Sequence, residues 1–405
     1  MGGFWIFAAV ALVVLSAPLN SPPLLLTGTL VLLLALLSHW WARYSLVNVE
    51  YRHWLSSYRI FVGEDVQFTI QLTNQKFLPL PWVHITGELP RDVAPIQGRL
   101  SAAQDQSRGI LSNLLSMSWY HRTSRHYTLR GRHRGHYFLG PVRIRSGDLF
   151  GMFTSEMNIE RDQYISVYPP ILPLAPTRLP SGEPYGSIRA RKTLVDDITR
   201  PMGSREYAVG DTLRYIHWKA TAHTGRLQTK VFDASTTANF VLMMGVRTVE
   251  PPLQGSIPHL LELGVLATTA LTNYALEQGY NVGVYVNQTG RLTSQLMKVP
   301  PARDDQQLMR VLDVMAQVHP VESIPLADLI LEESRHLPRG TTLAVVTSLP
   351  DENTMSTLSR LQRAGWSVAL VHLGGTGFGN TNSPIPTYTV PETTEWENLE
   401  EILIQ

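Results

Sequence analysis

The stretch NFVLMMGV at residues 239–246 is followed by IPHLLELGVLATTALTNYALEQG at 257–279 and by NVGVYVN at 281–287. The first and third runs are continuously apolar, as strands buried on both faces of a sheet are. The middle run has one apolar stripe at helical spacing, formed by Leu260, Leu263, Ala267, Leu271 and Tyr274. The order strand, helix, strand predicts a parallel crossover, and this unit decides the fold of the C-terminal domain.

Alternation of apolar strands and amphipathic helices continues toward the C-terminus. It appears in DDQQLMRVLDVMAQV, PLADLILEESRHL, TTLAVVTSL, ENTMSTLSRLQRAG and WSVALVHL, which together span residues 304–373. Repeated alternation of this kind is typical of a doubly wound α/β sheet with helices on both faces. We therefore predict a doubly wound α/β domain over residues 234–405.

The middle of the chain, residues 44–170, has a different period. In EDVQFTIQLTNQ at 64–75, apolar and polar residues alternate strictly, and similar runs begin at Trp82, Met117, Pro141 and Gln163. A period of two indicates strands with one face buried, and many short runs separated by turns predict a small antiparallel sandwich or barrel, of which we take the β-sandwich. The segment 91–109, rich in Gln, Ser, Ala and Asp, is predicted to be a mobile loop.

A basic, aromatic run lies inside this predicted β-sandwich, at residues 119–151. Seven arginines precede its first acidic residue, Asp148; they are Arg122, Arg125, Arg130, Arg132, Arg134, Arg143 and Arg145. Such a run could bind nucleic acid or the anionic headgroups of a membrane. Alternating arginines are also what the solvated face of a strand carries, and we prefer that interpretation. The glycines of the run are expected to serve turns and close backbone approach.

The first 41 residues contain no Asp, Glu, Lys or Arg. Two apolar segments, at about 2–19 and 22–41, are each about one bilayer long and are separated by a proline-flanked break. They predict a transmembrane helical hairpin, residues 1–43. A signal peptide is the alternative for the first segment, but the positively charged start is missing. A buried hairpin in a soluble domain is the other alternative.

Charge next to the second segment predicts the orientation. Arg43, Arg52 and Arg59 follow it, whereas the hairpin turn carries no positive charge. The positive-inside rule therefore places the bulk of the chain in the cytoplasm of a two-pass protein of the cell membrane. The formal net charge of the whole chain is +1, so no global attraction to nucleic acid is expected. The chain has no cysteine, which excludes disulfides, thiolate nucleophiles and cysteine-ligated zinc.

The run REYAVGDTLRYIHWKATAHTGRLQTKVFD at residues 205–233 concentrates Arg, Glu, Asp, His, Trp and Lys. We expect Asp211 to cap a helix that begins at Thr212 and ends near His223, with Gly225 just after its end. Arg214 would then lie over the indole of Trp218, four residues along the same face. RLQTKVF is expected to be a strand. On this interpretation, the run is a structural junction within a linker, residues 171–233.

A catalytic interpretation of the same run would use Asp211, His217 and Lys219 as acid, base and electrostatic partner. Two positions apart on a helix, His217 and Lys219 would point to different sides, and no serine or cysteine nucleophile accompanies them. His217 and His223 are six residues apart, which does not match a helical zinc pair. We therefore prefer a structural role and expect no catalytic residue.

Two motifs resemble known family signatures. The pattern R-x-Y-x-x-G-D-x-x-R-x-I-H-W-K is similar to that of domain-of-unknown-function family 58; its members here are Arg205, Tyr207, Gly210, Asp211, Arg214, Ile216, His217, Trp218 and Lys219. RGHYFLGPVRIRSGDLFGMF at residues 134–153 resembles the family's second hallmark. The resemblance implies a von Willebrand factor A-like C-terminal domain and association with a MoxR-type AAA+ ATPase. It implies no established reaction.

Metal binding by A domains uses D-x-S-x-S after the first strand, because a hard cation needs carboxylate and hydroxyl oxygens from one loop. Here the first strand runs into MMGVRTVE, which has no Asp and no serine pair. Thr347, Ser348 and Asp351 follow a later strand, where we expect them to cap the next helix. We therefore expect no metal and no cofactor.

These observations together predict an α+β multidomain protein that acts as a membrane-tethered adaptor. Its expected partners are the lipid bilayer and, from the resemblance, a MoxR-type AAA+ ATPase, with no nucleic acid. The alternatives left open are an enzyme that uses the Asp211, His217 and Lys219 cluster, and a protein that binds anionic lipid or nucleic acid through the basic run.

Overall fold

A computed structural model describes residues 2–16, 18–19, 21–97, 100–160, 163–175, 201–206, 216–232, 239–250, 255–290, 294–338, 340–374, 385–393, 396 and 399–404. The chain divides into two compact units, Met1–Pro170 and Ile171–Gln405. Helices and antiparallel sheets make up the first unit, and a mixed, mostly parallel α/β sheet is the largest part of the second. The α+β class predicted from the sequence is confirmed at this level.

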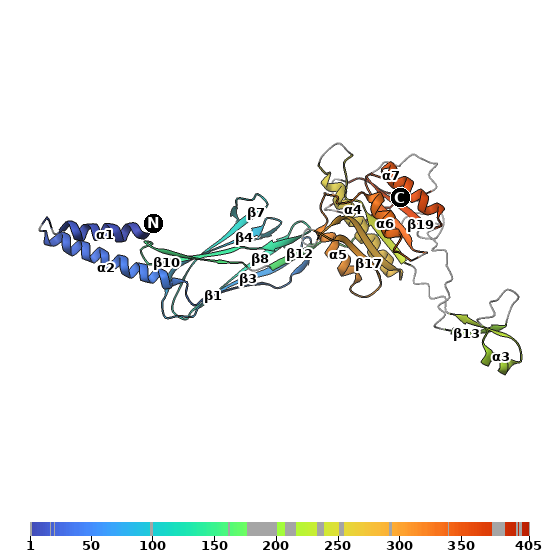
Figure 1. Ribbon diagram of the computed structural model, residues 1–405, viewed down its shortest axis with the longest axis horizontal. Helices are drawn as coiled ribbons and strands as arrows, with labels where there is room; N and C mark the ends of the chain where they lie inside the picture. The colour runs from blue at the N-terminus through green and yellow to red at the C-terminus, as the bar shows by residue number, and fades with distance from the viewer. Residues whose placement is uncertain are drawn as a thin grey trace. The chain divides into compact units, whose positions relative to one another are not determined.

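The first unit begins with two apolar helices that lie side by side, α1 (Gly2–Ser16) and α2 (Pro22–Ser45) (Figure 1). They approach closely at Gly28, where an added Cβ would lie 3.0 Å from the Val13 side chain. Among the described residues, α2 is the one helix long and apolar enough to cross a membrane, with a mean hydropathy of 1.8. With 15 residues, α1 is shorter than the roughly 20 residues that span a bilayer.

The second helix continues four residues past the predicted end at residue 41. Its last carbonyl groups have a partner from outside the helix, because the Lys76 ammonium donates to the backbone oxygens of Ser45 and Val47, both at 2.7 Å. Carbonyls at a helix C-terminus lack intrahelical donors, so a cation there supports the last turn.

Three sheets complete the first unit. One, with all neighbours antiparallel, has the order β1 (Val49–Leu55), β3 (Asp65–Asn74), β8 (Arg122–Gly131), β5 (Val93–Pro95). Another, also antiparallel, has the order β11 (Thr154–Ile159), β10 (Val142–Gly147), β4 (Leu80–Pro90), β7 (Arg108–Met117), β6 (Ser101–Ala102). The third has the order β2 (Arg59–Phe61), β12 (Gln163–Tyr168), β9 (Gly135–Leu139), with β2 parallel to β12.

One hydrophobic cluster takes residues from all three sheets. The alternating residues that predicted the first strand contribute to it as expected, since Val66, Phe68, Ile70 and Leu72 are all buried. The prediction of a loop at 91–109 is wrong in part. Its apolar residues Val93 and Pro95 are buried in the short strand β5, which pairs with β8. Part of this polar stretch therefore forms the edge strand of a sheet.

The second unit contains a small two-stranded sheet of β13 (Pro201–Glu206) and β14 (Gln228–Phe232), with the short helix α3 (Trp218–Thr224). The strand predicted after the turn is thus confirmed as β14. The predicted helix start at Thr212 lies outside the described residues, but a helix running through to His223 is wrong. Ile216 forms a β-bridge with Thr229, and α3 begins only after His217.

The rest of the second unit is built on a six-stranded sheet. Its order is β17 (Leu296–Ala302), β16 (Asn281–Thr289), β15 (Asn239–Met244), β18 (Thr342–Thr347), β19 (Ser367–Leu373), β20 (Thr387–Val390). All neighbours are parallel except β16 and β17. The helices are α4 (Pro258–Glu277), α5 (Gln307–Gln317), α6 (Leu326–Ser334) and α7 (Glu352–Arg363). The crossover predicted from the three opening runs is therefore present as β15, α4 and β16.

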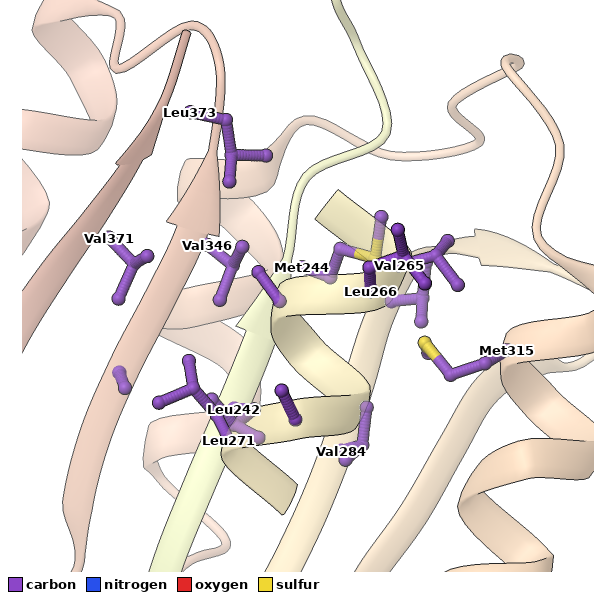
Figure 2. Packing of buried hydrophobic residues seen from close by; sticks show 14 of the residues in the cluster. Leu242, Met244, Val265, Leu266, Leu271, Val284, Met315, Val346, Val371 and Leu373 are labelled. Carbon is purple, nitrogen blue, oxygen red and sulfur yellow. The ribbon is translucent and has the colours of Figure 1, made fainter. Parts of the chain in front are cut away.

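Each face of this sheet has its own core. Figure 2 shows Leu242 and Met244 of β15 beside Leu266 and Leu271 of α4, with Met315 of α5 at the edge of the same cluster. The alternate side chains of β15 pack in a second cluster, with residues of α6 and α7. Because successive side chains of a strand point to opposite faces, burial of both sets requires cover on both faces, which explains the continuous apolar run.

Candidate functional site

The residues of the signature motif fall into two groups. Tyr207, Gly210, Asp211 and Arg214 lie outside the described residues, so the stacking of Arg214 on Trp218 and the convergence of Asp211 with His217 stay predictions. The others are placed on the β13, α3 and β14 segment. The backbone of Arg205 pairs with Thr229, Ile216 is buried, Trp218 is 70% exposed and Lys219 is exposed.

His217 caps the short helix. Its Nδ1 accepts a hydrogen bond of 3.1 Å from the backbone N–H of Ala220. The backbone N–H of His217 donates a hydrogen bond of 2.7 Å to the backbone oxygen of Gln228. At the other end of the helix, Gly225 has a φ of +68° and its N–H donates to Thr221 O. A left-handed residue at this position favours glycine, as the sequence predicted. One imidazole nitrogen of His217 is thus engaged in holding local backbone structure.

Arginines of the basic run form ion pairs with acids on neighbouring strands. Arg130 contacts Asp65 across β8 and β3 at 2.6 Å, and Arg143 and Arg145 of β10 both contact Glu156 of β11. In β10 the two arginines occupy the exposed positions of an alternating pattern. For these three residues, the structure matches the solvated strand face that the sequence favoured.

The strongest candidate site lies in the second unit, at the carboxyl ends of β15, β16 and β18. A cleft of about 830 Å³ opens there, and its lining includes Arg247, Asn287, Glu322, Ser348 and Asp351. In α/β sheets this edge is where ligands bind, because the loops that follow adjacent strands diverge there. The volume is within the roughly 300–1,000 Å³ range of small-ligand pockets.

Asn287 organises the floor of this cleft. Its Oδ1 accepts the N–H of Val246 at 2.9 Å, and its Nδ2 donates to Ile324 O at 3.2 Å and to Glu322 at 3.4 Å. Glu322 also forms an ion pair with Arg247. Arg247 belongs to the loop that follows β15, and its ion pair joins this loop to the one that carries Glu322.

The loop after β18 is organised by side-chain hydrogen bonds. Asp351 accepts the N–H of Thr354 at 2.9 Å as the N-cap of α7, as the sequence predicted. Thr347 accepts the N–H of Leu349 at 3.2 Å, and Ser348 donates to Arg247 O at 3.1 Å. All three oxygens thus have backbone partners that order the cleft wall.

A buried histidine of the neighbouring strand β19 also contacts the loop after β18. His372 of β19 donates from Nε2 to Ser348 O at 3.2 Å, since a carbonyl oxygen can only accept. Burial lowers the pKa of His372, while the hydrogen bond to Ser348 opposes that shift. The neutral imidazole is therefore the form that the fold favours.

The described lining of the cleft carries four carboxylates, on Glu250, Glu322, Asp351 and Glu352, and one guanidinium, on Arg247. This gives an acidic excess at the sheet edge. Sequence reasoning singled out Thr347, Ser348 and Asp351 but missed Asn287 and Glu322. Asn287 could have been found as the last residue of a predicted apolar strand, NVGVYVN; Glu322 lies in a connecting loop and carries no comparable signal.

The fold and the motif together define a family. The family model described as "Protein of unknown function DUF58" matches residues 203–371, which cover the signature motif and most of the α/β sheet. The recognition of this family from the signature motif is confirmed over the matched residues. Residues before 203, including the second motif, lie outside the matched range.

A similar relative is the "Uncharacterized protein YeaD" of Bacillus subtilis (strain 168), which is 23% identical over 204 residues. The aligned part is 50% of this chain and 49% of YeaD, so the match spans about half of the relative's length. YeaD is a distant homologue.

Solved structures similar to this chain include a PapD-like domain of human CEP192, with a TM-score of 0.17, 15% identity, and coverage of 30% of this chain and 87% of that one. Spo0M, a sporulation control protein from Bacillus subtilis, has a TM-score of 0.17, 11% identity, and coverage of 30% and 49%. TM-scores this low support no conclusion about fold or function.

Proposed function

We propose that this protein is a two-pass membrane protein whose cytoplasmic part binds other proteins. In this proposal α1 and α2 form a transmembrane hairpin, the antiparallel sheets form a β-sandwich, and the C-terminal unit is a von Willebrand factor A-like domain. The long apolar helix α2 and the arginines that follow it support the membrane placement.

The acidic cleft at the carboxyl edge of the sheet carries the proposal. Here a fixed ion pair, Arg247 with Glu322, lies in that region. The surrounding acidic excess complements a basic side chain of a partner protein, because opposite potentials favour encounter and fix register.

A MoxR-type AAA+ ATPase is the partner that the family resemblance favours. It would engage the cleft through a lysine or arginine. The adaptor would then hold the ATPase at the membrane. No cofactor and no nucleic acid take part in this proposal.

Binding experiments test this assignment. The full-length chain, purified in detergent, is mixed with a MoxR-type ATPase, and the affinity is measured for the parent and for the double variant Glu250→Gln, Glu352→Gln. Both glutamates are exposed. Losing two exposed charge contacts is expected to weaken binding about 3- to 10-fold. The control, Glu277→Gln, removes one charge at the end of α4, which leads into the amino end of β16.

No measurable binding by the parent would exclude this partner. An equal loss in the Glu277→Gln control would exclude the cleft as the contact surface. The rival enzymatic assignment has a different signature, since a general base at His217 predicts a loss of turnover of about a hundredfold or more in His217→Gln. The cap formed by His217 favours the structural role over this rival.

A further inference from the structure

The turn between β10 and β11, residues 147–153, is organised by one buried carboxylate. Asp148 is 1% exposed, and its two oxygens accept the backbone N–H groups of Phe150, Met152 and Phe153 at 3.0, 3.3 and 2.8 Å. We call this segment the Asp148 turn. The N–H groups of Phe150, Met152 and Phe153 are thus satisfied within the turn and do not depend on water.

Glycines make this conformation possible. Gly151 has a φ of +71°, and a Cβ on Gly147 would lie 2.3 Å from Phe153 O and 2.9 Å from the Trp82 ring. The hallmark SGDLFGMF therefore encodes a specific turn. Its tip carries two large apolar side chains, Leu149 and Phe150, which are 70% and 60% exposed.

The base of the Asp148 turn is attached to α2. Phe153 packs with Ala35 and Ala42 in one hydrophobic cluster, and its ring contacts His39 edge-on at 5.1 Å. Ser155 Oγ donates to Ala42 O at 2.6 Å. The turn is thus fixed to the last three turns of the helix.

The length of α2 places this turn at the membrane. From Pro22, where α2 begins, to Ala35 the helix rises only about 20 Å. A hydrocarbon core is about 30 Å thick. If α2 spans the bilayer, residues beyond Ala35 must also lie in it, and the turn packed against them lies at the same depth. The three amides that Asp148 satisfies and the apolar tip suit that environment, because hydrocarbon offers no hydrogen-bond partner.

A pocket of about 600 Å³ lies between α2 and the Asp148 turn. Its apolar lining includes Leu34, Leu37 and Trp41 from α2, Met117 from β7, and Leu149 and Phe150 from the turn. Such a volume is ordinary for a ligand site. Leu37 and Phe150 are exposed as well as pocket-lining, so the pocket opens toward the medium around α2.

Two exposed aromatic side chains lie on loops that contribute to the same pocket. The loops that contribute Pro79 and Ser118 to its lining also carry Phe77 and Trp119, whose exposed rings stack at 5.5 Å. Exposed Trp and other aromatic residues next to an apolar helix are typical of the headgroup region of a bilayer.

We propose that this pocket binds one acyl chain of a membrane phospholipid, with the Asp148 turn inserted into the leaflet beside it. The inference rests on the membrane placement of α2 in the proposed function. The bilayer is the source of the ligand because α2 is itself a pocket wall.

Labelling tests the insertion. The chain has no cysteine, so a single cysteine at Phe150 can carry an environment-sensitive fluorophore in the full-length protein reconstituted in phosphatidylcholine and phosphatidylglycerol vesicles. Quenching by doxyl-labelled lipid is expected. The control position is the exposed residue Ser57, which follows the end of β1. This strand begins shortly after α2 in the chain and extends roughly 20 Å, so no quenching is expected at Ser57. Equal quenching at both positions, or none at Phe150, overturns the proposal.

Lipid retention tests the pocket. Ser116→Trp places a bulky ring at an exposed pocket-lining position of β7, and Ser112→Trp is the control on the same strand outside the pocket. Native mass spectrometry of detergent-purified protein should show bound phospholipid in the parent and in Ser112→Trp, and at least fivefold less in Ser116→Trp. Equal retention of phospholipid in both variants, or no bound phospholipid in the parent, overturns the proposal.

A label at Leu33, exposed on α2, separates the two proposals. If this position is not quenched, the membrane placement itself fails. If Leu33 is quenched but Ser116→Trp keeps its lipid, only the acyl-chain site fails.

Discussion

Three polar side chains of this protein act on the backbone around them. His217 caps α3, Asp351 caps α7, and Asp148 satisfies three amides of its own turn. The role of Asp351 was predictable, because an acid just before a helical pattern is a common N-cap. The role of Asp148 was not predictable. Its three backbone donors lie in the turn that follows it, and a turn has no periodic sequence pattern from which its geometry could be predicted.

Replacing Asp148 by alanine should destabilise the first unit by about 2–4 kcal/mol, because three buried amides lose their acceptor. Asp148→Asn keeps one acceptor oxygen and should cost less. Thermal unfolding followed by circular dichroism in detergent measures both. If alanine is tolerated as well as asparagine, these hydrogen bonds do not hold the turn.

His372 should make stability depend on pH. Its pKa is lowered in the folded protein, so below the unfolded value of about 6.5 the unfolded state takes up a proton that the folded state resists. The stabilisation is complete above that value and is lost as the pH falls toward the folded pKa. His372→Gln keeps a donor for Ser348 O without this titration.

The free energy of unfolding of the parent and of His372→Gln is measured from pH 7.5 to 5. Because the chain has 13 histidines, the difference between the two curves is the informative quantity. We expect the parent to lose more stability on acidification. Parallel curves would show that His372 does not contribute.

At the scale of elements, helices and strands with a strong period are where the sequence predicted them, and short elements are not. The crossover of β15, α4 and β16 was visible because burial on both faces forces continuous apolar runs. Helix α3 has seven residues, too few for a periodic stripe, and Ile216 is drawn into a bridge with β14. A tertiary partner therefore decided the start of that helix.

Removing the cap of α7 should loosen that helix locally. Asp351→Ala is expected to cost about 0.5–2 kcal/mol, which lowers amide protection in the first turn about 2- to 30-fold. Hydrogen exchange of peptides covering Glu352–Arg363 measures this. Asp351→Asn should retain most of the protection, because asparagine is an equally good cap; a similar loss in both variants would mean that charge matters more than the cap.

At the scale of the whole molecule, the first unit begins with a short apolar helix, α1, and a longer one, α2. Length and apolar composition make α2 a membrane anchor candidate, whereas α1 is shorter than a full span. The predicted two-pass topology requires the turn between them to lie on the side of the membrane opposite the rest of the chain.

Cysteine accessibility tests that topology. A single cysteine at Ser21, between the helices, should react in intact cells with a membrane-impermeant maleimide, whereas one at exposed Ser57 should react only after lysis. The absence of native cysteine removes background labelling. Labelling of both positions in intact cells, or of neither, contradicts the two-pass cytoplasmic arrangement.

The sequence by itself determined the elements whose burial leaves a period: the apolar helix α2, the alternating strands of the first unit and the crossovers of the second. It also identified the family through the signature motif at residues 205–219. Tertiary structure alone decided which loops meet. Asn287, Arg247 and Glu322 form one network because adjacent parallel strands end at one edge, and the Asp148 turn meets α2 because Phe153 packs on Ala35. Contacts between residues distant in the chain depend on packing geometry, which local patterns do not encode.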